Sequence, residues 1–277
     1  MRAFLLFLLV SVCFLTRLVQ AAPPAPSYTI YGTVRDAHGN PLNTLAGEII
    51  VSRPTGEEIV RGPSESQLAP AINYTVHVAM DGGTTPVLYK SNAMFTAQPF
   101  TIKVLFNGVL YTPIEMHGAN WTAGLPGASV RINLTLGPSS ANDGLPDAWK
   151  QDLINSDPTG RLRTFADIKP GDDLDGDGLT NLQEFIAGTN PLDRSDALSL
   201  SVIEVNNGIA HLEFYAVRGR TYHLTSSSDM VTWSQQPFST EPTAANQVTS
   251  RLEPDGQLLE IYVPVGTTSA LFKLYVE

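Results

Sequence analysis

Oxygen-bearing side chains recur at alternate positions in the stretch DLDGDGLTNLQE, which runs from Asp173 to Glu184. Carboxylates stand at its first, third, fifth and twelfth positions, an amide at the ninth, and a glycine at the sixth. Calcium is a hard cation that takes about six to eight oxygen ligands, and alternate residues of a tight loop can aim three carboxylates at one point. The glycine permits the sharp turn that such a loop requires. The stretch therefore matches the calcium loop pattern D-x-D-x-D-G-x5-E.

The pattern assigns a role to each candidate ligand. The predicted metal ligands are the side chains of Asp173, Asp175, Asp177 and Glu184, the backbone carbonyl of Leu179, and Asn181 acting through a water molecule. An acidic turn that is only solvated is the alternative interpretation. Carboxylates crowded to about 4 Å repel each other by about 1 kcal/mol per pair in water, and by more near a protein surface. This repulsion favours a bound cation, and we predict Ca²⁺.

A short helix is expected directly after the loop. Thr180 and Gln183 form a T-x-x-Q capping box, and apolar residues follow at helical spacing. Gly188 suits a left-handed helix end, and Pro191 prevents the helix from continuing. On the other side of the loop, Pro170 excludes a helix that runs straight into it. The sequence therefore predicts half of a helix–loop–helix hand, with the ligands first and one helix after them.

An imperfect copy of the loop lies upstream. Residues 143–147 (DGLPD) align with residues 177–181 (DGLTN), which places Ser139, Ala141 and Lys150 at positions one, three and twelve of the copy. A cation there would lose most of its negative ligands. Two interpretations stay open: the copy is vestigial, or it lends one or two oxygens to the intact loop. A second short helix should follow it and pack against the first.

These residues carry a family resemblance. The run NDGLPDAWK, followed by DDLDGDGLTNLQEFIAGTNPLD, resembles the calcium-binding repeats of dockerins and of the thrombospondin type 3 kind over about 55 residues. Dockerins usually carry two intact loops that end with Asp, whereas this chain has one intact loop that ends with Glu184. The resemblance implies a structural calcium module of a secreted multidomain bacterial protein. It leaves docking onto a partner protein as an alternative.

The start of the chain predicts export. An apolar run covers residues 3–15, and Val19-Gln20-Ala21 offers a small-residue cleavage site, so residues 1–21 are expected to be a signal peptide. Cys13 is the only cysteine and lies in this run, so the mature chain would hold no disulfide. The run is short for a membrane span. We therefore expect a secreted or cell-surface protein, with no membrane span in the mature chain, that depends on core burial or a metal.

Three parts are expected after cleavage near Ala21. Residues 27–137 and 198–277 have alternating apolar positions and frequent turn residues, and the calcium segment at residues 138–197 separates them. Strands are predicted at 28–34, 48–52, 74–79, 86–89, 100–105 and 130–136, and again at 198–205, 209–216, 221–226, 248–252, 259–263 and 271–276. The opening GTVRDAHGNPL resembles carboxypeptidase-regulatory-like and Ig-like sandwich domains. The predicted class is mainly β, with two β-sandwich domains joined by a short helical EF-hand-like segment.

Composition bears on the kind of partner. The formal net charge is −10, and seven of these net negative charges fall between Asp143 and Asp196. The sequence has no cluster of Lys and Arg residues of the kind that binds phosphates, which argues against nucleic acid as a partner. The five histidines are scattered without metal-ligand spacing, and no G-x-S-x-G motif occurs, so we do not expect an enzyme.

The predicted function is therefore calcium binding that rigidifies the link between two β domains, with an affinity on the order of 10⁻⁴ M. The partner of such a structural protein would be an unidentified surface, matrix component or glycan. One alternative is a carbohydrate-binding accessory protein in which Trp233 and Tyr215 stack on sugar rings. A dockerin-like docking protein is the other.

Overall fold

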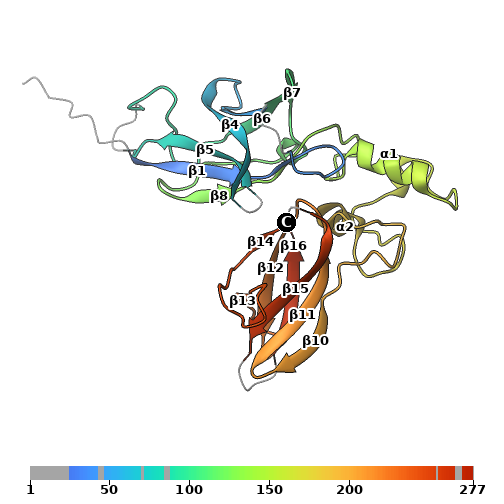
Figure 1. Cartoon of the computed structure of the whole chain (residues 1–277). Coiled ribbons are helices and arrows are strands. Elements are labelled where there is room, and N and C mark those ends of the chain that lie inside the picture. The colour runs from blue at the N-terminus through green and yellow to red at the C-terminus, as the bar shows by residue number, and fades with distance from the viewer. Residues whose placement is uncertain are drawn as a thin grey trace, which may run out of the picture.

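The computed structural model describes residues 25–42, 47–69, 72–83, 88–253, 255–265 and 270–276. The predicted signal peptide and Cys13 lie outside these residues. The described chain is mainly β, with separate sheets and a short helical segment near the Asp-rich loop, so the predicted fold class is confirmed (Figure 1). Neither α-helix in the described ranges has the length and apolar character needed to cross a membrane.

The N-terminal unit is built on a seven-stranded sheet of order β7-β6-β3-β4-β5-β1-β8. Its strands are β1 (Ala25–Gly32), β3 (Gly47–Ser52), β4 (Glu58–Ala69), β5 (Ile72–Met80), β6 (Thr101–Phe106), β7 (Val109–Tyr111) and β8 (Ser129–Arg131). Neighbouring strands are antiparallel, except that β8 runs parallel to β1. A separate parallel pair joins β2 (Val34–Arg35) to β9 (Leu134–Thr135).

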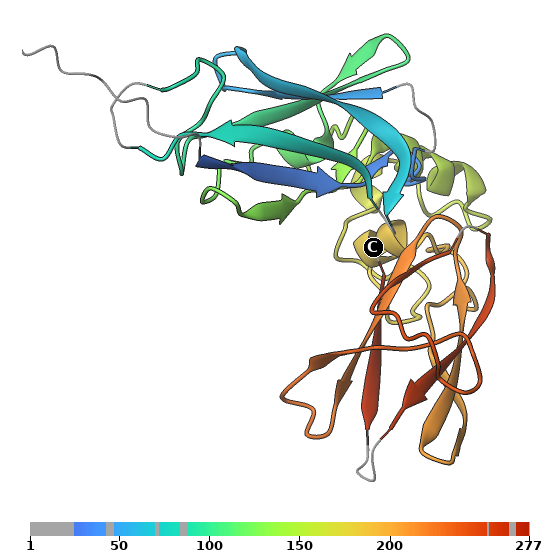
Figure 2. The ribbon, with the colours of Figure 1, turned by 60° about the vertical axis from the view of Figure 1, so that its left-hand side comes forward.

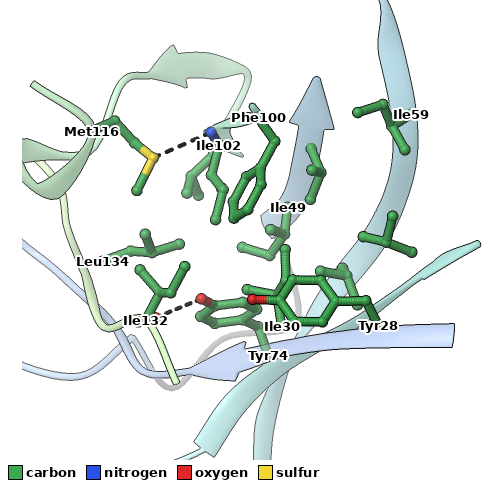
Figure 3. Packing of buried hydrophobic residues seen from close by; sticks show 14 of the residues in the cluster. Tyr28, Ile30, Ile49, Ile59, Tyr74, Phe100, Ile102, Met116, Ile132 and Leu134 are labelled. Atoms are coloured by element: carbon green, nitrogen blue, oxygen red, sulfur yellow. Dashed lines mark hydrogen bonds between the residues drawn. The ribbon is translucent and has the colours of Figure 1, made fainter. Parts of the chain in front are cut away.

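Apolar side chains from both halves of this sheet enclose one core. Figure 3 shows Ile49 and Ile102 of one half lying over Ile30 and Tyr74 of the other, and all four are fully buried. The Tyr74 hydroxyl donates a hydrogen bond of 2.5 Å to the carbonyl of Ile132. The alternation of buried and exposed residues that predicted the first strand is present in β1. The unit is thus one sheet curled over its own core.

Several strands of this unit differ from the predictions: the strand expected at 130–136 is divided into β8 and β9, the one at 28–34 is interrupted at Thr33, and β4 and β7 were not predicted. No strand covers Leu88 and Tyr89, and the rest of the predicted strand at 86–89 lies outside the described residues. Conversely, β4 is the longest strand of the unit, although its sequence contains Gly62 and Pro63. Glycine and proline usually weaken strands, and the tertiary pairing of β4 with both β3 and β5 overrides that preference.

The central segment contains α1 (Asp147–Ser156), a single 3₁₀ turn at Phe165–Asp167, and α2 (Asn181–Ala187). Its core consists of Leu145, Trp149, Leu153, Leu162, Ile168 and Phe185. The rings of Trp149 and Phe185 meet edge to face, with centroids 5.5 Å apart. The two helices therefore share one small core, as the sequence predicted, and the long connection between them is held by buried Leu162 and Ile168.

The C-terminal unit is a sandwich of two sheets (Figure 2). One sheet has the order β10-β11-β15, and the other joins β13, β14 and β16 to β12. The strands are β10 (Ser201–Asn206), β11 (Ile209–Ala216), β12 (Thr221–Ser227), β13 (Ser234–Gln236), β14 (Arg251–Leu252), β15 (Gln257–Pro264) and β16 (Leu271–Val276). Buried residues of both sheets, among them Phe214 and Tyr222, form its core.

The two aromatic residues of the predicted sugar platform lie on different sheets. Tyr215 is exposed on β11, whereas Trp233 directly precedes β13 of the other sheet and carries the Lys273 ammonium 4.0 Å from its ring centroid. No ring contact joins Tyr215 to Trp233 among the described residues. The two side chains do not make a shared stacking surface.

All three parts meet around one buried arginine. Arg220 precedes β12 and is only 3% exposed. One of its Nη atoms donates a hydrogen bond of 2.5 Å to the carbonyl of Gly39, in the turn after β2, and the other donates a bond of 3.2 Å to the carbonyl of Phe185 in α2. Gly39 has a φ of +86°, and a Cβ there would lie 2.9 Å from the Phe185 ring. The same turn contacts α1, since His38 Nδ1 lies 2.7 Å from an oxygen of Asp152.

Candidate metal centre

The Asp side chains of the loop first serve to fold its backbone. Asp173 accepts hydrogen bonds from the amides of Gly176 and Gly178, at 2.7 and 3.0 Å. Asp175 accepts one from the amide of Asp177, and Asp177 accepts one from the amide of Leu179. Gly176 and Gly178 have φ values of +78° and +104°, which side-chain-bearing residues rarely adopt. The alternating acids therefore wind the chain into a tight loop around their own carboxylates.

The same winding gathers the three carboxylates. Asp173, Asp175 and Asp177 each offer an oxygen within 4.8 Å of the other two. The Oδ2 atoms of Asp175 and Asp177 are buried and have no hydrogen-bond partner in the structure. A buried oxygen that carries negative charge is costly unless a cation or a donor meets it. The geometry of the loop thus leaves two carboxylate oxygens in need of a positive ligand.

Helix α2 contributes the remaining predicted side-chain ligands. The capping box predicted at its start is present: the Thr180 hydroxyl accepts from the amide of Gln183, and the Gln183 side chain accepts from the amide of Thr180. Asn181 and Glu184 follow on the first turn and are both fully buried. Asn181 donates through Nδ2 to the carbonyl of Lys169 at 2.7 Å, whereas its Oδ1 has no partner. Both carboxylate oxygens of Glu184 are also buried without a partner.

Electrostatics show how closely these acids crowd. Burial, followed by the negative charges of Asp175, Asp177 and Asp173, raises the pKa of Glu184 to about 8. Burial is also the first cause that raises the pKa of Asp175, with its two neighbouring aspartates adding to it. Without a cation, the ionised forms of these side chains are unfavourable in the folded protein. A bound divalent ion would stabilise the ionised forms and so offset both the burial and the mutual repulsion of these acids.

The donor set fits calcium. Five buried oxygens lack a partner among the predicted ligands: Asp175 Oδ2, Asp177 Oδ2, Asn181 Oδ1 and both Glu184 oxygens. All are hard oxygen atoms, and no nitrogen or sulfur ligand joins the described acidic cluster. Bound calcium would supply the positive charge that neutralises the carboxylates. The carbonyl role of Leu179 and the water-mediated role of Asn181 stay predictions.

One acidic neighbour was missed by the sequence reasoning. Asp196 lies after α2 and is half-buried. Burial, followed by the negative charges of Asp193, Asp177 and Asp175, raises its pKa. One of its oxygens accepts a hydrogen bond from the amide of Asn190 at 2.9 Å. The twelve-residue pattern does not extend to position 196. The turn after Gly188 brings Asp196 close to the acidic loop. Asp196 adds to the negative potential of the centre.

Residues 173–194 match the bacterial TSP3 repeat. Such a repeat implies calcium binding, and it typically occurs in extracellular proteins. No curated protein and no solved structure gave a significant match to the chain. The matched segment covers the intact loop, α2 and the turn after it, so the dockerin and Ig-like resemblances stay predictions.

Calcium affinity should fall as the pH drops below 8. Because the pKa of Glu184 is raised to about 8, this side chain carries a proton at lower pH, and the ion must displace it. We expect the apparent dissociation constant to rise by up to about tenfold per pH unit between pH 8 and pH 6. Calorimetric titration with calcium in buffers of different ionisation enthalpy would measure both the affinity and the released proton. An affinity that is flat over this range would contradict the assignment of Glu184.

The raised pKa of Glu184 has the opposite effect on the calcium-free protein, whose stability should be greater at lower pH. An unfolded glutamate has a pKa of about 4.3, so the folded apo protein holds its Glu184 proton more tightly than the unfolded chain does. The stability of the chelated protein should therefore decrease as the pH rises from about 5 through 8. Thermal melting in chelator across this range checks the sign.

Proposed function

We propose that calcium in this loop fixes the C-terminal sandwich against the N-terminal unit, and that the chain acts as a secreted or cell-surface structural protein. One observation carries the proposal. Glu184, the predicted closing ligand, is followed by Phe185, whose carbonyl accepts the hydrogen bond from Arg220 of the C-terminal unit. A ligand of the ion and the contact between units are thus adjacent residues of one helix.

Packing supports the same coupling. The Phe185 ring lies in the core with Trp149 of α1, and it also approaches Gly39 of the N-terminal unit. Helix α2 has only seven residues, and isolated helices of that length are unstable in water. The helix therefore depends on its packing and on the loop that leads into it. Calcium would hold the loop, the loop would hold α2, and α2 would hold the two β units together.

The ion should change the shape of the molecule in solution. We expect the protein with calcium to scatter X-rays as one rigid body, and the chelated protein to show a larger radius of gyration with a broader distribution of distances. Magnesium at equal concentration is the control, because it favours smaller, octahedral sites and should not restore the compact form. Identical scattering before and after verified calcium removal would contradict the coupling.

In this role the chain performs no catalysis, and the β units act as spacers or adhesive modules toward a surface or matrix partner. Support comes from the C-terminal unit, where several large apolar side chains are exposed: Val202, Ile203, Val205, Tyr215 and Leu258. Binding of the purified protein to extracellular matrix or cell-envelope fractions, with and without calcium, would test that role.

A further inference from the structure

The degenerate loop at residues 139–150 has the same closing hydrogen bond as the intact loop, at a constant offset of 34 positions. In the intact loop the amide of Asn181 donates to the carbonyl of Asp172 at 2.8 Å. At the equivalent place the amide of Asp147 donates to the carbonyl of Pro138 at 2.9 Å. This bond ties the ninth position to the residue that precedes the first. The two loops are therefore closed in the same way.

The turn inside the loops is also the same. Asp143 accepts a hydrogen bond from the amide of Leu145 at 3.1 Å, as Asp177 does from the amide of Leu179 at 2.6 Å. The fourth and sixth positions of both loops have positive φ values, at Asn142 and Gly144 and at Gly176 and Gly178. A helix begins at the ninth position of each loop, at Asp147 and at Asn181. The upstream stretch thus keeps the fold of a calcium loop although it lost most of its acidic residues.

The twelfth position shows what replaces the acids. Lys150 stands there, and its side chain is completely buried. Its Nζ donates a hydrogen bond of 2.6 Å to Oδ2 of Asp143. In the intact loop the equivalent atom is Oδ2 of Asp177, which is buried and has no partner. The atom that would face the ion in one loop therefore faces an ammonium group in the other.

Charge is balanced in each loop by a different cation. The intact loop holds four carboxylates and requires a divalent ion. The degenerate loop has the neutral residues Ser139 and Ala141 at positions one and three, which leaves Asp143 and Asp147 as its acids. Asp147 is engaged with the backbone amide and the hydroxyl of Ser140. Asp143 is left as the charge that a single ammonium can neutralise.

We propose that residues 139–150 form a metal-independent copy of the calcium loop, in which the Lys150 ammonium takes the place of the ion. The pair of loops then binds one calcium per chain, not two, and the degenerate loop lends no oxygen to a second ion. The inference rests on the proposed calcium site for its comparison. It also implies that the start of α1 keeps its structure when calcium is removed.

The first test counts ions. Terbium titration followed by luminescence, together with elemental analysis after dialysis against calcium, should give one ion per wild-type chain. The triple variant S139D/A141D/K150E restores the acidic pattern and should bind two. The variant K90E, which reverses the charge of an exposed lysine in the N-terminal unit, should still bind one. Two ions on the wild-type chain, or one ion on a folded triple variant, would overturn the proposal. No ion on the wild-type chain would instead refute the calcium site itself.

The second test removes the ammonium. Lys150→Met keeps the length of the side chain but leaves Asp143 without its partner, so we expect the melting temperature to fall by about 6 °C or more. The loss should be equal with calcium and with chelator. Adding Asp143→Asn in the same chain should restore much of it, since the unpaired and partly buried carboxylate is then gone. A loss that appears only in calcium, or no loss at all, would show that Lys150 does not act as an internal cation.

Discussion

Glu184→Gln should abolish calcium binding while it stabilises the calcium-free protein. The amide keeps the shape of the carboxylate but removes the charge that closes the predicted coordination sphere. Because changes in the outer shell of a metal site already weaken binding by about 10- to 100-fold, loss of this ligand should exceed about 100-fold. At one hundred times the dissociation constant, the wild-type protein gains about 2.7 kcal/mol from the ion, or about 5–10 °C in Tm. The variant should lose this gain.

In chelator at pH 8, Glu184→Gln should melt at a higher temperature than the wild-type protein. There the wild-type chain must bury a carboxylate whose pKa is raised to about 8, whereas the glutamine is neutral. The wild-type protein should therefore have the higher Tm in calcium, and the variant should have the higher Tm in chelator. Glu204→Gln, on the exposed strand β10, removes the same charge elsewhere and should leave both curves unchanged. A variant that still melts higher in calcium would remove Glu184 from the site.

Arg220→Ala should separate the two β units even in saturating calcium. The guanidinium donates to the carbonyls of Gly39 and Phe185, and both acceptors would lose a buried donor. Hydrogen bonds from charged groups contribute about 1.5–3 kcal/mol each, so the two together predict a loss of about 3–6 kcal/mol, or at least about 6 °C in Tm. Small-angle scattering of the variant with calcium should resemble that of the chelated wild-type protein.

A matched control stands two residues away. Arg218 is exposed, and Arg218→Ala removes the same chemical group without touching the junction. Its scattering and melting should equal those of the wild-type chain. If Arg220→Ala bound calcium normally and kept the compact form, the contact between the units would have to depend on other residues, and Phe185 would not transmit the effect of the ion.

The sequence predicted the parts of this structure that depend on short-range chemistry. The alternating acids, the glycine at position 178 and the Thr180 capping box all act within twelve residues, so their pattern alone predicts the loop and the helix after it. The left-handed end at Gly188 was predicted for the same reason. Alternating apolar residues likewise predicted the mainly β class. These features need no knowledge of distant contacts.

Long-range features were beyond the sequence. Strand β4 contains Gly62 and Pro63, and its neighbours in the sheet determine its conformation. Arg220 carries no local signal of burial, because its acceptors lie 181 and 35 residues away. Lys150 appeared as the loss of a ligand, and only its buried contact with Asp143 shows that one cation replaces another.

The turn at Gly39 places a condition on how this chain can be divided. A methyl group there would lie 2.9 Å from the Phe185 ring, so the surface of the N-terminal unit is shaped to a residue nearly 150 positions later. Fragments cut at the boundaries between the three parts would expose this apolar contact and the buried Arg220 side chain to water. The three parts are thus not independent modules. A chimera that replaces either β unit should fold only if Gly39, Phe185 and Arg220 are all kept.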